Sequence, residues 1–276
     1  MSGFKDRYGN WALVAGASEG VGLAFAHAMA EIGVNVVLLS RRQTVLEKVA
    51  GQLQEEHGIE TRVLAIDLFE KTAAASIIER TADLEIGLLI YCAGGDPNFR
   101  PFLESPISDG ESLLVRNCLI PMQLCHHFAQ PMVERGRGGI ILVSSGAGLV
   151  GVRRMVAYGA SKAFEIILGE ALWAELNEQG VDVLSLVLGV TDTPALRRTL
   201  AKRGMLADPD DGTPIPGASA PKEVVIEALD NLSDGPTWIV GEHVREGTRA
   251  LGAMNRNDAV WAMVEAGAGV LDQKLS

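Results

Sequence analysis

The segment AYGASKAF places Tyr158 and Lys162 four residues apart on a strongly helical stretch. Residues at this spacing share one face of a helix, so their side chains lie one turn apart. A phenol, with an unperturbed pKa of about 10, is a poor base at neutral pH. An ammonium group held nearby favours the phenolate and makes it a better base. The spacing therefore predicts a tyrosine general acid/base with a lysine partner.

Two further polar residues are expected close to this pair. Ser145 ends the apolar run GGIILVSS, thirteen residues before Tyr158. The run is typical of a buried strand, and ligands of doubly wound folds bind beyond the carboxyl ends of such strands. Asn117 interrupts the otherwise apolar stretch VRNCLIP in the preceding predicted helix. The predicted catalytic set is thus Asn117, Ser145, Tyr158 and Lys162.

A glycine-rich segment, AGASEGVG, lies between the first predicted strand and a helix. Gly16, Gly20 and Gly22 would let the chain turn tightly and approach a pyrophosphate, which then rests on the helix N-terminus. The spacing is G-x-x-x-G-x-G, and a glycine triplet alone is weak support. Its position between a strand and a helix makes a dinucleotide site the favoured interpretation.

The second predicted strand ends in Ser40 and is followed by Arg41 and Arg42, with no acidic residue. An acidic residue there would hold a ribose 2′-hydroxyl, whereas arginine accepts a 2′-phosphate. A bound 2′-phosphate would supply the anion that the two guanidinium groups lack. We therefore expect NADP(H) rather than NAD(H), with Ser18 adding a hydroxyl to the phosphate pocket. The alternative is a pair of solvated surface arginines.

The helix after these arginines is expected to begin near Thr44. Thr44 and Glu47 have the spacing of a capping box. Cations at a helix N-terminus cost about 0.3–1 kcal/mol. The position of the two arginines is therefore unfavourable unless an anion is present.

Six nearly continuous apolar runs alternate with helical patterns, as is typical of parallel strands buried on both faces. The runs cover residues 11–17, 34–40, 61–67, 86–94, 138–145 and 181–189. Their alternation predicts an α/β doubly wound parallel sheet, a three-layer Rossmann fold, in a single domain over residues 1–276. Gly33, Gly58 and Gly180 are expected to end helices in a left-handed conformation.

The composition changes after residue 190. Residues 193–221 are rich in Pro, Gly and Asp. The segment is long for a plain connection, which favours a substrate lid at about 194–218. A helix at 222–232, a short strand at 237–241 and a helical tail at about 243–276 are expected to follow.

Charge and composition exclude several classes of protein. The net charge of −11 and the pI near 5.0 argue against a nucleic-acid binder. No apolar window is long enough for a membrane span, and the N-terminus has no signal-peptide pattern. The three cysteines are too few for a disulfide framework, so a reduced cytoplasm is expected. Cys118, Cys125, His126 and His127 lack a second ligand cluster, and no metal site is predicted.

Together these motifs resemble the short-chain dehydrogenase/reductase family along almost the whole chain. The resemblance lies in AGASEGVG, Asp67, CAGG, Asn117, Ser145 and YGASK. Within the family the chain looks most like NADP-dependent 7β-hydroxysteroid dehydrogenases, mainly in the cofactor-binding third (RYGNWALVAGASEGVGLAF, NVVLLSRR and HGIETRV). The resemblance also implies a homodimer or homotetramer.

The family pattern implies a role for each matching residue. Tyr158 would exchange a proton with the substrate oxygen, and Ser145 would orient that oxygen. Lys162 would hold the nicotinamide ribose, and Asn117 would complete a proton relay from Lys162 to solvent. The implied cofactor-binding residues are Gly16, Ser18, Gly20, Val21, Gly22, Arg41, Arg42, Asp67, Leu68, Ala93, Gly94, Tyr158, Lys162, Thr191 and Thr193.

The substrate is expected to be a bulky, mainly apolar alcohol or ketone, with a steroid-like molecule as one option. Three segments should form its pocket: residues 146–155, the loop at 96–102 and the lid. Their large apolar residues include Leu149, Val150, Val152, Met155, Leu196, Leu200 and Met205. Arg153 and Arg154 either contact an acidic group of the substrate or are solvated charges, and the second interpretation is favoured.

Two other functions stay open. One is reduction of 3-oxoacyl thioesters on a carrier protein, for which Arg135 and Arg137 are candidate docking residues. The other is a catalytically silent NADP-binding sensor. The intact set of Asn117, Ser145, Tyr158 and Lys162 argues against a silent protein, because a binder gains nothing from an activated phenol.

Overall fold

The computed structural model describes residues 3–95 and 99–271. Its centre is a seven-stranded sheet in the order β3-β2-β1-β4-β5-β6-β7, with every neighbouring pair parallel. The order reverses between β1 and β4, and doubly wound folds bind ligands in the crevice that this reversal creates. The strands are β1 (Trp11–Ala15), β2 (Asn35–Ser40), β3 (Thr61–Ala65), β4 (Ile86–Tyr91), β5 (Gly138–Ser145), β6 (Val181–Leu188) and β7 (Thr237–Ile239).

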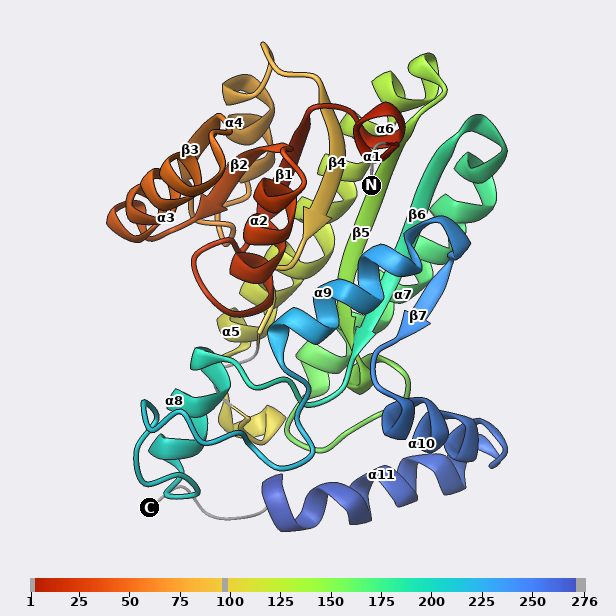
Figure 1. Cartoon of the computed structure of the whole chain (residues 1–276). Coiled ribbons are helices and arrows are strands. Elements are labelled where there is room, and N and C mark those ends of the chain that lie inside the picture. The colour runs from red at the N-terminus through yellow and green to blue at the C-terminus, as the bar shows by residue number, and fades with distance from the viewer. Residues whose placement is uncertain (1–2, 96–98, 272–276) are drawn as a thin grey trace.

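Helices cover both faces of the sheet (Figure 1). One apolar core includes residues from α2 (Gly20–Glu31), α3 (Gln43–His57) and α9 (Pro221–Asp230), and the short α1 (Phe4–Tyr8) packs there too. The other includes residues from α4 (Ala73–Arg80), α6 (Ile120–Arg135) and α7 (Val156–Leu176). In β2, Val36 and Leu38 enter the first core, and Val37 and Leu39 the second. This alternation is that of a strand buried on both faces, so the predicted three-layer single-domain fold is confirmed.

Shorter elements gather beyond the carboxyl ends of the strands, where Figure 1 shows α8, α10 and α11. These elements are the helices α5 (Ile107–Leu114), α8 (Pro194–Lys202), α10 (Glu242–Gly252) and α11 (Arg256–Leu271), and the short turns η1 (Phe102–Glu104), η2 (Val115–Leu119) and η3 (Gly146–Gly148). Two further short turns, η4 (Asn177–Gln179) and η5 (Leu232–Asp234), follow α7 and α9. The helical tail returns to the segment after Ser145, because Arg256 Nη1 donates to the Leu149 carbonyl at 2.8 Å. No helix within the described ranges is long and apolar enough to cross a membrane.

The predicted helix ends are mostly as expected, but the start of α3 is not. Gly33, Gly58 and Gly180 have φ of 76°, 66° and 82°, the left-handed conformation that glycine adopts without strain. The predicted capping box is wrong. The helix begins at Gln43 with Arg42 as its N-cap residue, which places Thr44 inside the first turn. Glu47 instead accepts a hydrogen bond from Gln43 Nε2 at 2.8 Å.

An N-terminal clamp fastens α1 to the sheet. The carboxylate of Asp182, near the start of β6, accepts hydrogen bonds from Arg7 Nε at 2.5 Å, Arg7 Nη2 at 2.6 Å and Tyr8 Oη at 2.7 Å. The Asp182 side chain is 3% exposed, whereas that of Arg7 is 52% exposed. Burial raises the pKa of Tyr8 above its usual value, and the Asp182 carboxylate adds to the effect. The clamp therefore joins the first helix to a strand far along the chain.

Replacing Asp182 with alanine should destabilise the fold by about 2 kcal/mol, because a buried phenol and a half-exposed guanidinium lose a charged acceptor. Urea unfolding followed by circular dichroism measures the loss. Asp83→Ala is the matched control, since its bonds to Arg62 Nη1 and Nη2 are exposed. A shift of the unfolding midpoint no larger than that of the control would contradict the prediction.

Candidate active site

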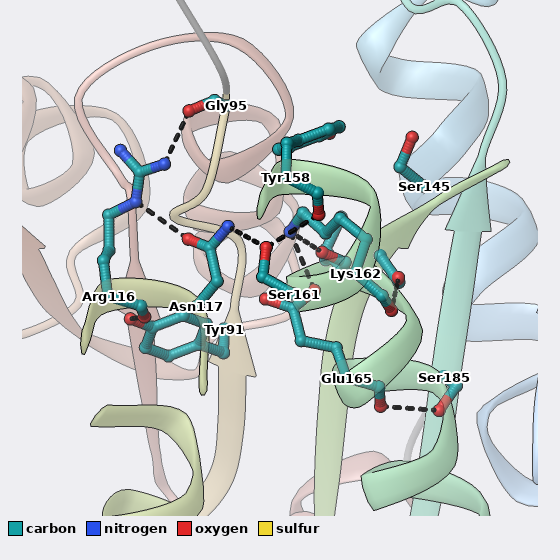
Figure 2. A network of polar contacts seen from close by, with 12 residues as sticks. Tyr91, Gly95, Arg116, Asn117, Ser145, Tyr158, Ser161, Lys162, Glu165 and Ser185 are labelled. Carbon is teal, nitrogen blue, oxygen red and sulfur yellow. Dashed lines mark hydrogen bonds and ion pairs between the residues drawn. The ribbon is translucent and has the colours of Figure 1, made fainter. Parts of the chain in front are cut away.

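The four predicted catalytic residues come from three elements at the carboxyl edge of the sheet (Figure 2). Ser145 is the last residue of β5, Asn117 lies in η2, and Tyr158 and Lys162 lie in the first turns of α7. The Lys162 ammonium is 5.9 Å from the centre of the Tyr158 ring. In Figure 2, Tyr158 lies above Lys162 and Glu165, and Ser145 lies to the right of Tyr158, outside the dashed contacts. The fold thus gathers residues that are up to 45 positions apart.

Close packing fixes α7 against the strands. Ser144 Oγ donates to the Lys162 carbonyl at 2.7 Å, and this bond joins β5 to the helix. A Cβ at Gly148 would lie 2.7 Å from the backbone nitrogen of Ala163, closer than the packing of any larger residue allows. Glycine therefore lets η3 approach the helix at the turn that carries Lys162.

Asn117 is held in a hydrogen-bonded chain. Its side chain is fully buried, Nδ2 donates to Ser161 Oγ at 2.8 Å, and Ser161 Oγ donates to the Tyr158 carbonyl at 2.8 Å. On its other side, Arg116 Nε donates to Asn117 Oδ1 at 2.9 Å. η2 is a π-helical turn, a feature frequent at functional sites. The turn directs Asn117 inward and couples it to the turn of α7 that carries Tyr158.

Arg116, which the sequence analysis missed, ties this chain to its surroundings. It donates to the Gly95 carbonyl at 2.5 Å, and its guanidinium lies 4.6 Å from the centre of the Phe69 ring. Its backbone carbonyl accepts a hydrogen bond from Tyr91 Oη. Burial lowers the pKa of Arg116. Only the fold brings these partners together, so no local pattern could have found them.

Lys162 is almost completely buried and carries a carboxylate partner. Its ammonium donates to the Val143 carbonyl at 2.9 Å and to Glu165 Oε2 at 2.7 Å. The side chains of Lys162 and Glu165 are 4% and 0% exposed. Burial raises the pKa of Glu165 to about 7, although the Lys162 and Arg116 cations act in the opposite direction. The sequence analysis missed Glu165, which a search for polar residues three positions from Lys162 would have found.

The glycine segment forms a cradle at the start of α2. Gly16 has a φ of 91° and donates from its backbone to the Leu39 carbonyl at 2.8 Å. A Cβ at Gly22 would overlap the carbonyl group of Gly16. A Cβ at Gly20 would lie 3.1 Å from Thr193 Cγ2, which places the segment after β6 beside the cradle. These close approaches are those that a pyrophosphate site requires, so the residues present fit a dinucleotide.

The other predicted cofactor residues are distributed around the same crevice. A Cβ at Gly94 would lie 2.7 Å from Lys162 Nζ and 3.1 Å from Asn117 Oδ1, so the end of β4 touches the catalytic residues. Thr193 caps α8 by accepting from the Leu196 backbone at 3.2 Å. The remaining ones are Val21 and Leu68, which are buried, Ala93, which is half-buried, Asp67, which accepts from the Phe69 backbone, and Thr191, which forms a bridge with Ser219.

The two arginines after β2 have acidic partners within the chain, contrary to expectation. Arg42 Nη2 lies 2.9 Å from Glu19 Oε2 and donates to Ser18 Oγ at 2.8 Å. Arg41 Nη1 lies 3.7 Å from Asp67 Oδ2. Burial acts to raise the pKa of Glu19, but hydrogen bonds from Arg198 and Arg42 hold it below its usual value. Local sequence could not show this, because the partners lie in other loops.

A pocket adjoins Tyr158, and its walls differ in part from those predicted. Segments 100–113 and 154–158 line it. None of the seven predicted apolar residues is among its described lining residues, neither those of the expected lid nor those of segment 146–155: Leu149, Val150, Val152, Met155, Leu196, Leu200 and Met205. Of the expected loop at 96–102, residues 96–98 lie outside the described ranges. The lining residues are Arg100, Phe102, Ser105, Pro106, Ile107, Asp109, Gly110, Leu113, Arg154, Val156, Ala157 and Tyr158.

A second group of potential ligands lies elsewhere. His27, Glu56 and His57 offer one ligand atom each, and these atoms lie within 4.8 Å of one another. His27 is in α2 and the other two end α3, where Glu56 is exposed. The group contacts none of the four catalytic residues named above, and we assign it no part in the reaction.

A sheet that reverses at β1 and β4, a glycine cradle and a Tyr–Lys pair at the carboxyl edge define a dinucleotide-dependent α/β oxidoreductase. The comparisons make the class specific. The family model described as short chain dehydrogenase matches residues 10–204. The chain belongs to the short-chain dehydrogenase family, whose members bind a nicotinamide cofactor.

Among curated relatives, a 7beta-hydroxysteroid dehydrogenase of Clostridium sardiniense is 32% identical over 257 residues, which cover 93% of this chain and 95% of the relative. The human very-long-chain 3-oxoacyl-CoA reductase is 32% identical over 189 residues, which cover 67% of this chain and 61% of that protein. Resemblance to the hydroxysteroid enzymes thus extends over most of the chain.

Solved structures give the same assignment. A 7beta-hydroxysteroid dehydrogenase solved in a study of stereoselectivity superimposes with a TM-score of 0.84 at 31% identity, over 94% of this chain and 98% of the other. A short-chain dehydrogenase from Sphingobium yanoikuyae in complex with NADPH has a TM-score of 0.75 at 26% identity, with 96% of each chain covered.

Replacing Gly22 with alanine should weaken nicotinamide dinucleotide binding by at least about tenfold. The added methyl group must displace the Gly16 carbonyl and open the cradle. Quenching of tryptophan fluorescence during cofactor titration measures the change. Gly51→Ala is the control, because this exposed glycine of α3 has no heavy atom within 4 Å of an added Cβ. Equal affinity of the Gly22 variant and the control would contradict the role of the cradle.

Proposed function

We propose that the protein is an NADP(H)-dependent oxidoreductase that interconverts a secondary alcohol and a ketone on a bulky, mainly apolar substrate. The observation that carries this proposal is the position of Tyr158. Tyr158 lines the pocket and lies on the same helix as the buried Lys162. The ammonium of Lys162 is hydrogen-bonded to Val143 of β5 and to Glu165 of α7. The pocket is where the substrate would lie, and the phenol is the group that would reach its oxygen.

In the proposed reaction the nicotinamide cofactor supplies or accepts the hydride. Tyr158 donates a proton from its phenol to the carbonyl oxygen during reduction and removes it during oxidation. Ser145, at the end of β5, donates a hydrogen bond to the same oxygen and orients it. Lys162 stabilises the phenolate by its positive charge and binds the ribose. Asn117, fixed by Arg116 and Ser161, keeps the turn that carries Tyr158 in place.

The preference for NADP(H) is supported by Arg41, Arg42 and Ser18. Arg42 and Ser18 are hydrogen-bonded to each other beyond the end of β2, where a 2′-phosphate would lie. Both guanidinium groups remain largely accessible, with 64% and 45% of their side chains exposed. The pairs with Asp67 and Glu19 are partly exposed and therefore weak, so a phosphate dianion can compete for these arginines.

The apolar substrate is supported by the pocket walls. Phe102, Ile107, Leu113 and Val156 face it together with Tyr158. Arg154 also lines it, which favours the interpretation that this arginine contacts an acidic group of the substrate, and the lining gives Arg153 no such part. The similarity to 7beta-hydroxysteroid dehydrogenases supports a steroid-like molecule.

Reduction of 3-oxoacyl thioesters is the second candidate, favoured by the similarity to a human 3-oxoacyl-CoA reductase. Docking of a carrier protein through Arg135 and Arg137 lacks support. Both arginines pair with Glu85, just before β4, at 3.6 and 3.0 Å. This is the amino end of the sheet, opposite Tyr158. The silent sensor is the least favoured, because a binder gains nothing from a phenol that lines the pocket beside a buried ammonium group.

A homo-oligomer in the cytoplasm is part of the proposal. Leu114, Met122 and Ile167 of α5, α6 and α7 are large apolar residues with 46%, 42% and 62% of their surface exposed, which supports a homo-oligomer built through these helices. Cys92, Cys118 and Cys125 are free cysteines, which supports the reducing cytoplasm.

Tyr158→Phe should lower kcat/KM by about 10²–10⁴-fold, because the proton-transferring hydroxyl is removed. NADPH binding should weaken by no more than about tenfold, since the cofactor would lose a single hydrogen bond. Steady-state oxidation of a panel of hydroxysteroids, with NADPH titration in parallel, measures both quantities. Tyr8→Phe, in the N-terminal clamp, is the control and should keep wild-type turnover. Turnover by the Tyr158 variant at the control's rate would refute the acid/base assignment.

The double variant Arg41→Ala, Arg42→Ala should bind NADPH at least about tenfold more weakly and NADH about equally well, since each charge-assisted bond to a phosphate is worth about 1.5–3 kcal/mol. Fluorescence titration with both cofactors gives the ratio. Lys48→Ala removes an exposed cation from α3, the helix that follows the two arginines, and controls for long-range charge. Unchanged NADPH affinity would identify the two arginines as surface charges.

A further inference from the structure

Glu165 is a buried carboxylate whose nearest cation is the catalytic lysine. It lies one helical turn after Lys162, its Oε2 is 2.7 Å from the lysine ammonium, and its side chain is fully buried. Its Oε1 is also buried and has no hydrogen-bond partner among the described residues. A carboxylate that is buried with one oxygen unsatisfied is costly to the fold, so its presence beside the active lysine requires an explanation.

A structural explanation is insufficient. The neighbours of Glu165 along α7 include the buried Ile166 and Gly169, so the packing of the helix does not itself require a carboxylate, and the polar partner of that carboxylate is the Lys162 ammonium. The hydrogen bonds from Ser144 Oγ to the Lys162 carbonyl and from the Lys162 ammonium to the Val143 carbonyl already fasten the helix to β5. The main effect of the Glu165 carboxylate is therefore on the charge of the site, and its effect on how α7 packs against the sheet is smaller.

Compared with the cysteines and the tyrosine around it, Glu165 is the group whose pKa lies near neutral pH, at about 7. Burial raises the pKa of Cys92, Cys118 and Cys125 to between about 11 and about 12, and that of Tyr91 well above 10. All four are thus neutral at neutral pH, whereas Arg116 stays charged. The groups that face Glu165 are Lys162 of α7, Arg116 and Cys118 of η2, Cys125 of α6, Tyr91 of β4, Cys92 after it, and Ser185 of β6, whose hydroxyl lies against the Glu165 carbonyl.

We propose that Glu165 is a positioning residue that acts through Lys162, by fixing the ammonium against Val143 and by setting the net positive charge behind the Tyr158 phenol. The proposal rests on the proposed function. When Glu165 is protonated, the pair carries one positive charge, and the phenolate is strongly stabilised. When Glu165 is ionised, the pair is neutral overall, and this stabilisation weakens. The site thus changes its own electrostatics over the range in which the enzyme works.

The geometry fits this role. The Lys162 ammonium has three N–H donors, of which two are used by Val143 and Glu165. The ammonium also lies against Gly94, where an added Cβ would be 2.7 Å from Nζ. The Val143 carbonyl and the Glu165 carboxylate thus fix the lysine through two of its donors, and the third would bind the cofactor ribose.

The first test is the pH–rate profile of alcohol oxidation by the wild type, Glu165→Gln, Glu165→Asp and the control Glu175→Gln, an exposed glutamate of the same helix. The rate of the wild type and of the control should rise with pH over a range broader than the loss of a single proton would give, because the ionisation of Glu165 adds a second step to the profile. Glu165→Gln removes the negative charge, so its profile should narrow to one step with a midpoint roughly one pH unit lower. Glu165→Asp should restore the broad profile.

A second test measures the protonation of the Glu165 carboxyl group directly and does not depend on turnover. Infrared difference spectra one pH unit either side of the expected pKa of about 7 should show a carboxylic-acid C=O band in the wild type and in Glu175→Gln. The band should be absent from Glu165→Gln. NADPH titration of the same samples should show weaker binding by Glu165→Gln than by the wild type, since Lys162 loses an anchor.

The outcomes separate this proposal from the proposed function. If Tyr158→Phe loses turnover but the Glu165→Gln profile overlays that of the wild type, the function stands and the role of Glu165 falls. A shift to higher pH also overturns it, because the carboxylate would then assist the phenolate. If Glu165→Gln does not fold, the wild-type infrared titration decides, and a missing acid band refutes the proposal. If Tyr158→Phe keeps turnover, both fall together.

Discussion

The buried ammonium of Lys162 is the constraint around which the rest of the site is arranged. Removing a charge of this size from water costs several kcal/mol unless partners replace the lost hydration. The partners are the Val143 carbonyl in β5 and the Glu165 carboxylate one turn along α7. Glu165 lies on the same helix, but the Val143 carbonyl is within reach only if α7 lies very close to the sheet, which the Ser144–Lys162 bond and the small Gly148 allow. Helix packing, strand register and the position of the phenol thus follow from one solvation requirement.

Most of the fold could be predicted from sequence because its signals are local. Strands buried on both faces of a parallel sheet are apolar along their whole length, and six of the seven were visible as such runs, while β7 was expected only as a short strand. Tyr158 and Lys162 were visible because a helix brings residues four apart onto one face. The cap at the start of α3 was predicted wrongly, because Thr44 and Glu47 have the spacing of a capping box even though the helix begins at Gln43. Local spacing alone cannot distinguish a cap from a first turn.

The remaining errors concern partners that are distant in sequence. Arg42 was expected to lack an anion, yet Glu19 reaches it from the glycine loop, and the same carboxylate accepts from Arg198 of α8 at 2.6 Å. One carboxylate therefore serves an arginine of the proposed phosphate pocket and an arginine of the expected lid. A charge pattern read along the chain cannot show such sharing, because which loops meet is decided by the order of the strands.

The substrate is the property least accessible from sequence, and the reason is the kind of structure that forms the pocket. The proposed cofactor-binding residues lie at strand ends and helix starts, whose positions the sheet fixes. The pocket walls come from the stretches 100–113 and 154–158, mostly irregular or short helical segments whose path depends on many weak contacts. Arg154 illustrates this, because it adopts a φ of 60°, a conformation rare for residues other than glycine. Relatives can therefore keep this sheet and cradle while their pockets diverge. The shared fold thus restricts the type of reaction more strongly than it restricts the substrate.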